Sequence, residues 1–342
     1  MKYISICDGI GAAHLAFTPI GWRCQAVAEI DPQCNAVLDQ HWGFENYYDI
    51  LSDETKKKIV GAKPDLIIGG TPCQSFSVAG LRGGISDSRG SLIHRYVQIV
   101  QDAQPRWFVW ENVPGIFSID DGATFAEFIR SFAELGYGVG WRMLDAQYFG
   151  VPQVRRRVFV VGCFGDPDGP LEVLFDSVGV PRRTSESDKT RKENQGTVAK
   201  CIRGRGQLAH REDSDTLIVD TSRARSIYGH SEKTHTLTSK CGNGISEDCA
   251  PLIASTLTGS DGGASNGHHP LVAAAPNAVR RLTPRECERL MGLPDDYTLV
   301  LYKGKPMKDS PRYRMIGNSI AVPVLRRIGE AIEQFERKEK RK

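Results

Sequence analysis

One cysteine of this chain stands in a setting that packing alone does not require. Cys73 follows Pro72 directly, and Gly69 and Gly70 separate this pair from a largely apolar run at residues 65–68. The proline ring restricts the backbone just before the cysteine, and a thiol held in a partly exposed, electropositive place can act as a nucleophile. A Pro-Cys pair in a loop is more often inert, so a catalytic role for Cys73 requires further reactive groups nearby.

A carboxyl group and two guanidinium groups stand at other strand-like segments. Glu111 follows the apolar run at residues 107–110, and Arg155 and Arg157 lead into the run at 157–163. A nucleophile, an acid and cationic groups on one rim would form a catalytic constellation. Taken singly, however, Glu111 also fits a helix cap, and the arginines also fit partners of surface acids.

The N-terminal segment carries a second candidate site. Gly9 and Gly11 allow the backbone to approach a ligand closely, and Glu29 stands at the usual distance for a carboxylate that binds ribose hydroxyls. His14 occupies the last position of the dinucleotide fingerprint, which favours a nucleoside-type ligand without pyrophosphate. A tight structural turn is the alternative explanation of the two glycines, in about a third of such cases.

The elements that would position these groups follow an alternating pattern. Strands are predicted at residues 3–7, 23–28, 65–68, 107–110, 138–144 and 157–163, and helices at residues 32–41, 91–101 and 124–135. Such alternation predicts the α/β class with a doubly wound, mostly parallel sheet. Ligands of these sheets bind at the carboxyl ends of the strands, where Cys73 and Glu111 also stand.

Composition divides the chain into three predicted parts. Residues 1–164 form the catalytic and cofactor-binding domain, and residues 165–279, rich in Gly, Ser, Thr and Asp, form a smaller, irregular, β-rich domain. From composition alone this middle part is equally a loop-rich insertion without a binding role. In residues 280–342 a capping box begins at Thr283, and the last helix, at residues 322–336, is expected to pack back on the first domain.

Composition and net charge favour a globular protein that does not span a membrane. The 342 residues are 40% hydrophobic and 25% charged, and no apolar run is long enough to span a bilayer. The N-terminus lacks a signal peptide's apolar region, so we expect a cytoplasmic protein. The net charge of +3 hides an excess of seven positive charges in residues 280–342, which suits a polyanionic partner or simply a solvated surface.

Several motifs, in one order along the chain, resemble those of the DNA cytosine-5 methyltransferase family. Pro72-Cys73-Gln74 resembles the family's nucleophile motif, and Glu111-Asn112-Val113 resembles its acid motif. Further segments resemble its remaining motifs, namely Asp8-Gly9-Ile10-Gly11, Gln153 with Arg155 and Arg157, Arg281 to Glu286, and Gly317-Asn318-Ser319. The match covers most of the chain outside residues 165–279, and Cys7 and Ile30 depart from it where the family usually carries an aromatic residue and Trp.

The resemblance implies a reaction and a set of roles. Cys73 would add to ring carbon 6 of a flipped-out cytosine, Glu111 would hold or protonate ring nitrogen 3, and Arg155 would assist near the base carbonyl, with Arg157 also in the catalytic set. The implied cofactor is S-adenosyl-L-methionine, bound by Asp8, Gly9, Ile10, Gly11, Glu29, Ile30, Asp49, Ile50, Pro72, Leu92, Asn318 and Ser319. The implied partner is double-stranded DNA, contacted by Ser75, Ser77, Arg89, Gln153, Arg182, Arg183, Arg203 and Arg205 and read by residues 165–279.

Two rival functions and several expectations accompany this hypothesis. An RNA cytosine methyltransferase would share the catalytic domain, and a non-catalytic relative would bind DNA without turnover. We expect a monomer without a membrane contact, and a cognate restriction endonuclease is a possible partner. No metal is expected, because Cys201, Cys241 and Cys249 include no close Cys-x-x-Cys pair.

Overall fold

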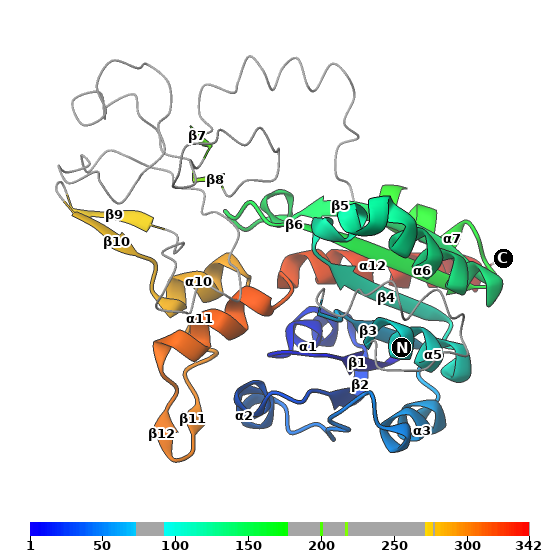
Figure 1. The fold of residues 1–342 in the computed structure, drawn as a ribbon, viewed down its shortest axis with the longest axis horizontal. Helices are drawn as coiled ribbons and strands as arrows, with labels where there is room; N and C mark the ends of the chain where they lie inside the picture. The colour runs from blue at the N-terminus through cyan, green and yellow to red at the C-terminus, as the bar shows by residue number, and fades with distance from the viewer. Residues whose placement is uncertain (73–91, 177–198, 201–215, 218–270, 276–277, 342) are drawn as a thin grey trace.

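The computed structural model contains one central β-sheet with helices on both of its faces (Figure 1). The structure describes residues 1–72, 92–176, 199–200, 216–217, 271–275 and 278–341. Cys73 and most of the predicted middle domain lie outside these residues. Within the described part, no helix is both long enough and apolar enough to cross a membrane.

The central sheet has six strands in the order β2-β1-β3-β4-β6-β5. The strands are β1 (Lys2–Ile6), β2 (Arg23–Ala28), β3 (Leu66–Gly69), β4 (Trp107–Asn112), β5 (Tyr137–Asp145) and β6 (Arg156–Phe164). The first four pair in parallel, whereas β6 runs antiparallel to both β4 and β5. The six predicted strands and the mostly parallel α/β sheet are therefore confirmed.

Helices fill the connections between the strands. The main ones are α1 (Ala12–Phe17), α2 (Pro32–His41), α3 (Asp53–Ala62), α5 (Leu92–Ala103), α6 (Ala123–Glu134), α10 (Pro284–Leu290), α11 (Asp309–Asn318) and α12 (Val322–Glu339). Short turns of helix are η1 (Thr18–Ile20), η3 (Pro114–Gly122), η4 (Ala146–Phe149), α7 (Gly169–Leu171) and η5 (Glu172–Asp176). Three two-stranded pairs complete the described elements: β7 (Ala199–Lys200) with β8 (Thr216–Leu217), β9 (Leu271–Ala275) with β10 (Ala278–Arg281), and β11 (Leu301–Tyr302) with β12 (Lys305–Pro306).

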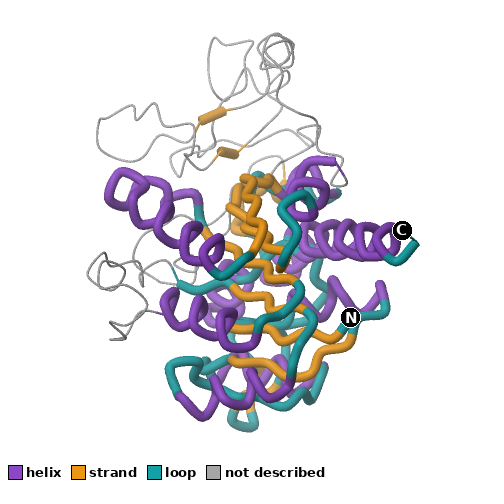
Figure 2. The backbone as a smooth tube through the Cα atoms, turned by 90° about the vertical axis from the view of Figure 1, so that its right-hand side faces the viewer, coloured by secondary structure: helices purple, strands orange, loops and turns teal. Residues whose placement is uncertain are grey.

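Neighbouring residues of each strand enter different cores, because successive side chains point to opposite faces of a sheet. Trp107 and Val109 of β4 pack in the core that contains α1, α2 and α12. Phe108 and Trp110 pack in the core that contains α5 and α6. Helices consequently lie on either side of the strands in the perpendicular view (Figure 2). A strand buried on both faces needs a continuous apolar run, which is the pattern seen in the sequence.

The C-terminal segment begins and ends as the sequence predicts. The Thr283 hydroxyl accepts a hydrogen bond from the Glu286 amide, and the Glu286 side chain accepts one from the Thr283 amide, which completes the capping box of α10. At the other end, Leu325, Ile328 and Ile332 of α12 are fully buried in the core shared with α1. Helix α12 therefore packs against α1. The predicted boundaries at residues 164 and 279 stay predictions.

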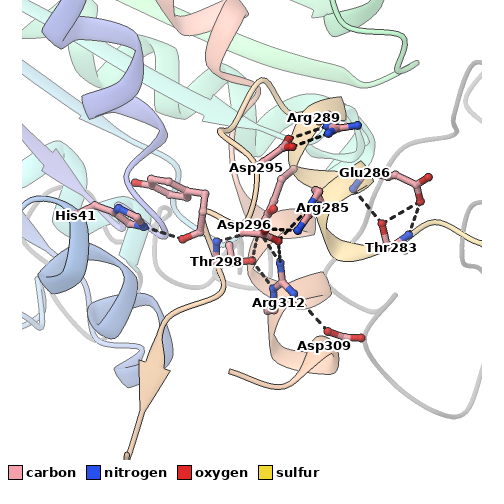
Figure 3. A network of polar contacts seen from close by, with 12 residues as sticks. His41, Thr283, Arg285, Glu286, Arg289, Asp295, Asp296, Thr298, Asp309 and Arg312 are labelled. Atoms are coloured by element: carbon pink, nitrogen blue, oxygen red, sulfur yellow. Dashed lines mark hydrogen bonds and ion pairs between the residues drawn. The ribbon is translucent and has the colours of Figure 1, made fainter. Parts of the chain in front are cut away.

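A buried polar network joins α10 to α11 (Figure 3). Glu288 and Arg312 are almost fully buried, and the Arg312 guanidinium lies 3.1 Å from the Glu288 carboxylate. The amide and hydroxyl of Thr298 also donate to this carboxylate. Around the network, exposed ion pairs join Arg285 to Asp296 and Arg289 to Asp295. Because burial makes an unpaired charge costly, the loop between the two helices is held in one conformation.

Replacing Arg312 by Met is expected to lower the free energy of unfolding by about 3–5 kcal/mol, because it leaves Glu288 buried without its cationic partner. Urea denaturation followed by circular dichroism measures this loss. Arg289→Met is the matched control, since Arg289 pairs with Asp295 on the surface. That control is expected to change stability little, and equal losses in the two variants would contradict the role of the buried pair.

Candidate active site

The carboxyl ends of β1, β3 and β4 open into one pocket. Residues after β1 and β3 line it together with Glu111 of β4 and the turn after α11: Cys7, Asp8, Gly9, Gly70, Glu111, Asn318, Ser319 and Ile320. The parallel register places Ile6 beside Gly69, and Gly69 beside Trp110. The pocket therefore combines residues predicted for the cofactor with the predicted acid, as expected at this sheet edge.

The loop after β1 is built around two glycines in the left-handed region. Gly9 has a φ of 62° and Gly11 a φ of 84°, conformations that favour glycine. The Gly9 amide donates to the Glu29 carboxylate at 2.7 Å, and the Asp31 amide donates to the other oxygen at 2.8 Å. A carboxylate accepts about four hydrogen bonds, so Glu29 keeps capacity for ribose hydroxyls. Burial raises the pKa of Glu29 above its ordinary value, although both amide bonds oppose the shift.

The Asp8 carboxylate bonds to the protein interior. Its oxygens bond to the Ser5 hydroxyl and, at 2.8 Å, to His14 Nε2, while His14 Nδ1 bonds to the Tyr3 hydroxyl at 2.8 Å. The His14 side chain is fully buried. The residue that interrupts the dinucleotide fingerprint thus anchors the loop from beneath. Sequence reasoning treated His14 only as a departure, because the pairing depends on a turn of helix α1 that returns His14 to Asp8.

The segments predicted to contact the ribose and adenine lie together. The Asn46 side-chain oxygen accepts hydrogen bonds from the amides of Glu29 and Tyr48, at 3.1 and 2.8 Å. Ile30 is 66% exposed, so its apolar side chain is open to a planar ring, whereas Ile50 is buried and Asp49 is exposed. Asn46 was not recognised in the sequence, since an isolated Asn carries no motif.

The residues that follow β3 lie in close contact with the end of β4. A Cβ on Gly69 would lie 2.7 Å from the Ile6 carbonyl oxygen, so this position needs glycine. A Cβ on Gly70 would lie 3.0 Å from Glu111 Oε2 and would crowd that carboxylate. Thr71 is then fixed from two sides. The Trp110 indole donates to its hydroxyl at 3.1 Å, and the Asn112 amide donates to its carbonyl at 2.8 Å. Thr71 and the exposed Pro72 therefore carry the chain to Cys73 from beside Glu111.

Glu111 and Arg157 form a partly buried ion pair at the pocket. Arg157 Nε lies 3.2 Å from Glu111 Oε1, and the two side chains are 12% and 11% exposed. Burial raises the pKa of the Glu111 carboxyl above its ordinary value, while the charges of Arg157 and Arg155 act in the opposite direction. A carboxyl of this kind holds a proton more readily than an exposed one, which suits proton donation.

Arg155 contacts the turn that follows α11, and its predicted role near the base stays a prediction. Its side chain is 2% exposed, and its guanidinium donates to the carbonyl oxygens of Gly317 at 2.8 Å and Ser319 at 2.7 Å. These bonds hold the turn that brings Asn318 and Ser319 into the pocket. Arg157 thus forms the ion pair with Glu111, and the positive charge of Arg155 also acts to lower the pKa of that carboxyl.

Other predicted site residues divide into described and undescribed ones. Leu92 begins α5 and is half-buried, Ile10 is buried in the cofactor loop, and Gln153 is fully buried. Cys73 and seven predicted DNA contacts lie outside the described residues, namely Ser75, Ser77, Arg89, Arg182, Arg183, Arg203 and Arg205. Cys201, Cys241 and Cys249 lie outside them too. Among the described residues, no group of three or more His, Cys, Asp or Glu side chains is arranged to hold a metal ion.

Comparison with known proteins matches residues 1–334 to the family of C-5 cytosine-specific DNA methylases. The chain belongs to this family. The type II methyltransferase M.HpaII of Haemophilus parainfluenzae is 30% identical over 96% of this chain and 88% of its own length. A protein of Escherichia phage P1, named a DNA N-6-adenine-methyltransferase, is 31% identical over 96% of this chain, which spans 61% of that relative. A structure described as a prophage-encoded DNA modification methyltransferase of E. coli aligns over 98% of this chain, with a TM-score of 0.60 and 19% identity.

Membership confirms the cytosine-5 DNA methyltransferase predicted from the motifs. The solved structure supports the fold alone, since its sequence identity is low. Among the described cysteines, Cys24, Cys34, Cys163 and Cys287 are buried, whereas Cys7 is partly buried. Burial raises the pKa of Cys7 to about 12, so this thiol in the pocket stays protonated and is a poor nucleophile.

Adding one methyl group at Gly70 should impair the acid without unfolding the protein. The new Cβ would crowd Glu111 Oε2, so Gly70→Ala is expected to lower the turnover number for methylation about tenfold. Turnover is measured with tritiated cofactor on DNA that contains the recognition site. In Gly61→Ala of α3 the Cβ meets nothing within 4 Å, so this control is expected to retain activity. An active Gly70→Ala variant would show that the carboxyl tolerates displacement.

Proposed function

We propose that this methyltransferase modifies carbon 5 of cytosine within a specific sequence of double-stranded DNA, with Cys73 as nucleophile and S-adenosyl-L-methionine as methyl donor. The observation that carries the proposal is that the glycine loop after β1, Gly70 and the buried Glu111 line one pocket. Arg157 pairs with Glu111, and Asn112 anchors the Thr71–Pro72 exit that leads to Cys73. Each part serves one requirement of the reaction, namely donor, acid and nucleophile.

The pocket suits the proposed cofactor. Glu29 offers acceptor capacity to ribose hydroxyls, Ile30 offers an exposed apolar surface to the adenine, and Asn318 and Ser319 line the pocket. The glycine loop leaves room for a compact methionine part beside Asp8 and Cys7. When bound there, S-adenosyl-L-methionine supplies a methyl group activated by its sulfonium charge.

The protein's own groups prepare the cytosine. The Cys73 thiolate forms a bond to ring carbon 6, and the electron pair displaced from the ring double bond makes carbon 5 nucleophilic. Protonated Glu111 donates to ring nitrogen 3, so negative charge does not accumulate on the ring. After carbon 5 has been methylated, a base, which we assign to water, removes its proton. The sulfur–carbon 6 bond then breaks and returns the Cys73 thiolate.

We assign the contact with the base carbonyl to Arg157. Its guanidinium already lies against the Glu111 carboxylate. The remaining N–H groups of this guanidinium can donate to the carbonyl oxygen of the cytosine that Glu111 protonates. Arg155 instead positions the Asn318–Ser319 turn of the cofactor pocket through the carbonyls of Gly317 and Ser319. The two arginines of one motif thus serve two neighbouring ligands.

Duplex DNA is the proposed partner. A stacked base cannot reach a pocket at the sheet edge, so the target cytosine has to flip out of the helix. Residues 165–279 are the proposed reader of the major groove, with Arg182, Arg183, Arg203 and Arg205 among its contacts, and Ser75, Ser77 and Arg89 near the flipped nucleotide. Gln153, which the motif resemblance also assigns to DNA, is fully buried. The positive charge of residues 280–342 supports binding to phosphates in the cytoplasm. A cognate restriction endonuclease is a further proposed partner.

Replacing Cys73 by Ala is expected to abolish methyl transfer while S-adenosyl-L-methionine still binds, because the thiol acts on the base and not on the cofactor. Tritium transfer and isothermal titration calorimetry measure the two properties. Wild-type protein with DNA carrying 5-fluorocytosine is expected to form a covalent adduct that Cys73→Ala does not form. Undiminished methylation by the variant would eliminate Cys73 as nucleophile.

Replacing Arg157 by Leu is expected to raise the pKa of Glu111 further, since it removes a charge that holds this pKa down. It is also expected to lower the turnover number about a hundredfold through loss of the base contact. Carbon-13 NMR of the labelled glutamate carboxyls follows the titration. Arg157→Lys keeps the charge and should move the pKa less. A pKa of Glu111 that falls or stays constant in Arg157→Leu would refute the coupling.

Bisulfite sequencing of DNA from cells that express the protein tests the proposed function as a whole. Conversion-resistant cytosines within one recurring sequence are the expected result, and they would be absent in cells that express Cys73→Ala. Methylation of transfer RNA but not of duplex DNA would favour the RNA methyltransferase, and DNA binding without methylation would favour the non-catalytic alternative. Methylation at adenine N6 would instead match the name of the phage P1 relative.

A further inference from the structure

A tyrosine from the C-terminal segment lies against the cofactor loop. Tyr297 is 3% exposed, and its hydroxyl donates a hydrogen bond of 2.9 Å to the carbonyl oxygen of Ile10. The same hydroxyl accepts a hydrogen bond of 2.8 Å from the Trp42 indole. Burial raises the pKa of Tyr297 above its ordinary value, so the phenol keeps the proton that it donates. Tyr297 and Ile10 are 287 residues apart in sequence.

The bonded carbonyl lies at the centre of the loop. Ile10 stands between Gly9 and Gly11, which both have positive φ, so the peptide orientation of the loop depends on what holds its carbonyl groups. Trp42, which donates to the Tyr297 hydroxyl, also lies close to the loop: a Cβ on Gly11 would be only 3.2 Å from its indole nitrogen. Beside it, the Gly9 amide bonds to Glu29, the predicted ribose ligand. A shift at Ile10 would therefore be transmitted to the donor site.

Tyr297 is itself held firmly. Its ring stacks on His41 at a centroid distance of 4.2 Å and an interplanar angle of 9°, and its carbonyl bonds to His41 Nε2 at 2.8 Å. The next residue, Thr298, bonds to buried Glu288, which pairs with Arg312 of α11 (Figure 3). This network begins a few residues after β10, where the chain leaves the predicted DNA-reading region. Tyr297 thus contacts the loop after β1 while His41 and the Glu288–Arg312 network hold it in place.

We propose that Tyr297 is a positioning residue for the methyl donor, and that its hydroxyl fixes the Ile10 peptide so that the Gly9–Gly11 loop is preformed. This inference rests on the proposed cofactor site. Loss of the hydroxyl leaves the Ile10 carbonyl and the Trp42 indole without this partner and lets the loop adopt other peptide orientations. The affinity for S-adenosyl-L-methionine falls, while Cys73 and Glu111, the groups that act on cytosine, are unaffected.

The test is Tyr297→Phe in the full-length protein. We expect the dissociation constant for S-adenosyl-L-methionine without DNA to rise about three- to tenfold, with a parallel rise in its KM and an unchanged turnover number at saturation. Calorimetry measures the binding, and steady-state kinetics measures the split between KM and kcat. Tyr313→Phe is the matched control, because the Tyr313 hydroxyl donates to the Leu282 carbonyl at 2.6 Å, in a bond outside the loop.

Each result has a defined meaning. Weaker donor binding in Tyr297→Phe alone, with melting temperatures similar in the two variants, supports the positioning role. Equal weakening in both variants, or a lower turnover number with unchanged donor affinity, overturns it. Failure of the wild-type protein to bind S-adenosyl-L-methionine would refute the proposed cofactor, and this result is visible before either variant is compared.

Discussion

The close contact between the exits of β3 and β4 is the central constraint of this methyltransferase. Parallel pairing brings the two strand ends together, and glycine at positions 69 and 70 removes the side chains that would keep them apart. Trp110 and Asn112, which flank Glu111 in sequence, then bond to Thr71. One strand thus carries Glu111, the proposed acid, and anchors the segment that leads to Cys73, the proposed nucleophile, so the two proposed groups share one support.

The proposed role of Glu111 as an acid depends on burial, which disfavours the charged carboxylate. Burial raises the pKa of Glu111, and the charges of Arg157 and Arg155 limit that rise, so the carboxyl holds a proton more readily than an exposed one. A surface glutamate would ionise at a lower pH and would not donate to a ring nitrogen. The same burial raises the pKa of Cys7 to about 12 and favours its protonated form too. Retaining the proton suits the proposed role of Glu111 as an acid, but it makes the Cys7 thiol a poor nucleophile.

The C-terminal segment is structural support for both ligand sites. Arg155 holds the turn of Asn318 and Ser319, and Tyr297 reaches the loop after β1, so residues distant in sequence complete the pocket. The buried pair of Glu288 and Arg312 fixes the loop from which Tyr297 extends. Ion pairs of this kind restrict alternative conformations more than they add stability, which is what a preformed binding loop requires.

Periodicity and motif order were sufficient to predict the sheet, its main helices, the capping box at Thr283 and the family. Strands buried on both faces need continuous apolar runs, and helix caps need particular residues at particular spacings. These features can therefore be predicted from residues that are neighbours in the sequence. The partners of Arg155, Arg157, His14 and Tyr297 were not predictable in this way. Arg155 and Arg157 stand two residues apart in one motif, yet they meet different partners, because the direction and register of β6 decide what each side chain faces. Tyr297 carries no local signal, since its bond to Ile10 exists only after the chain has folded back across the sheet edge.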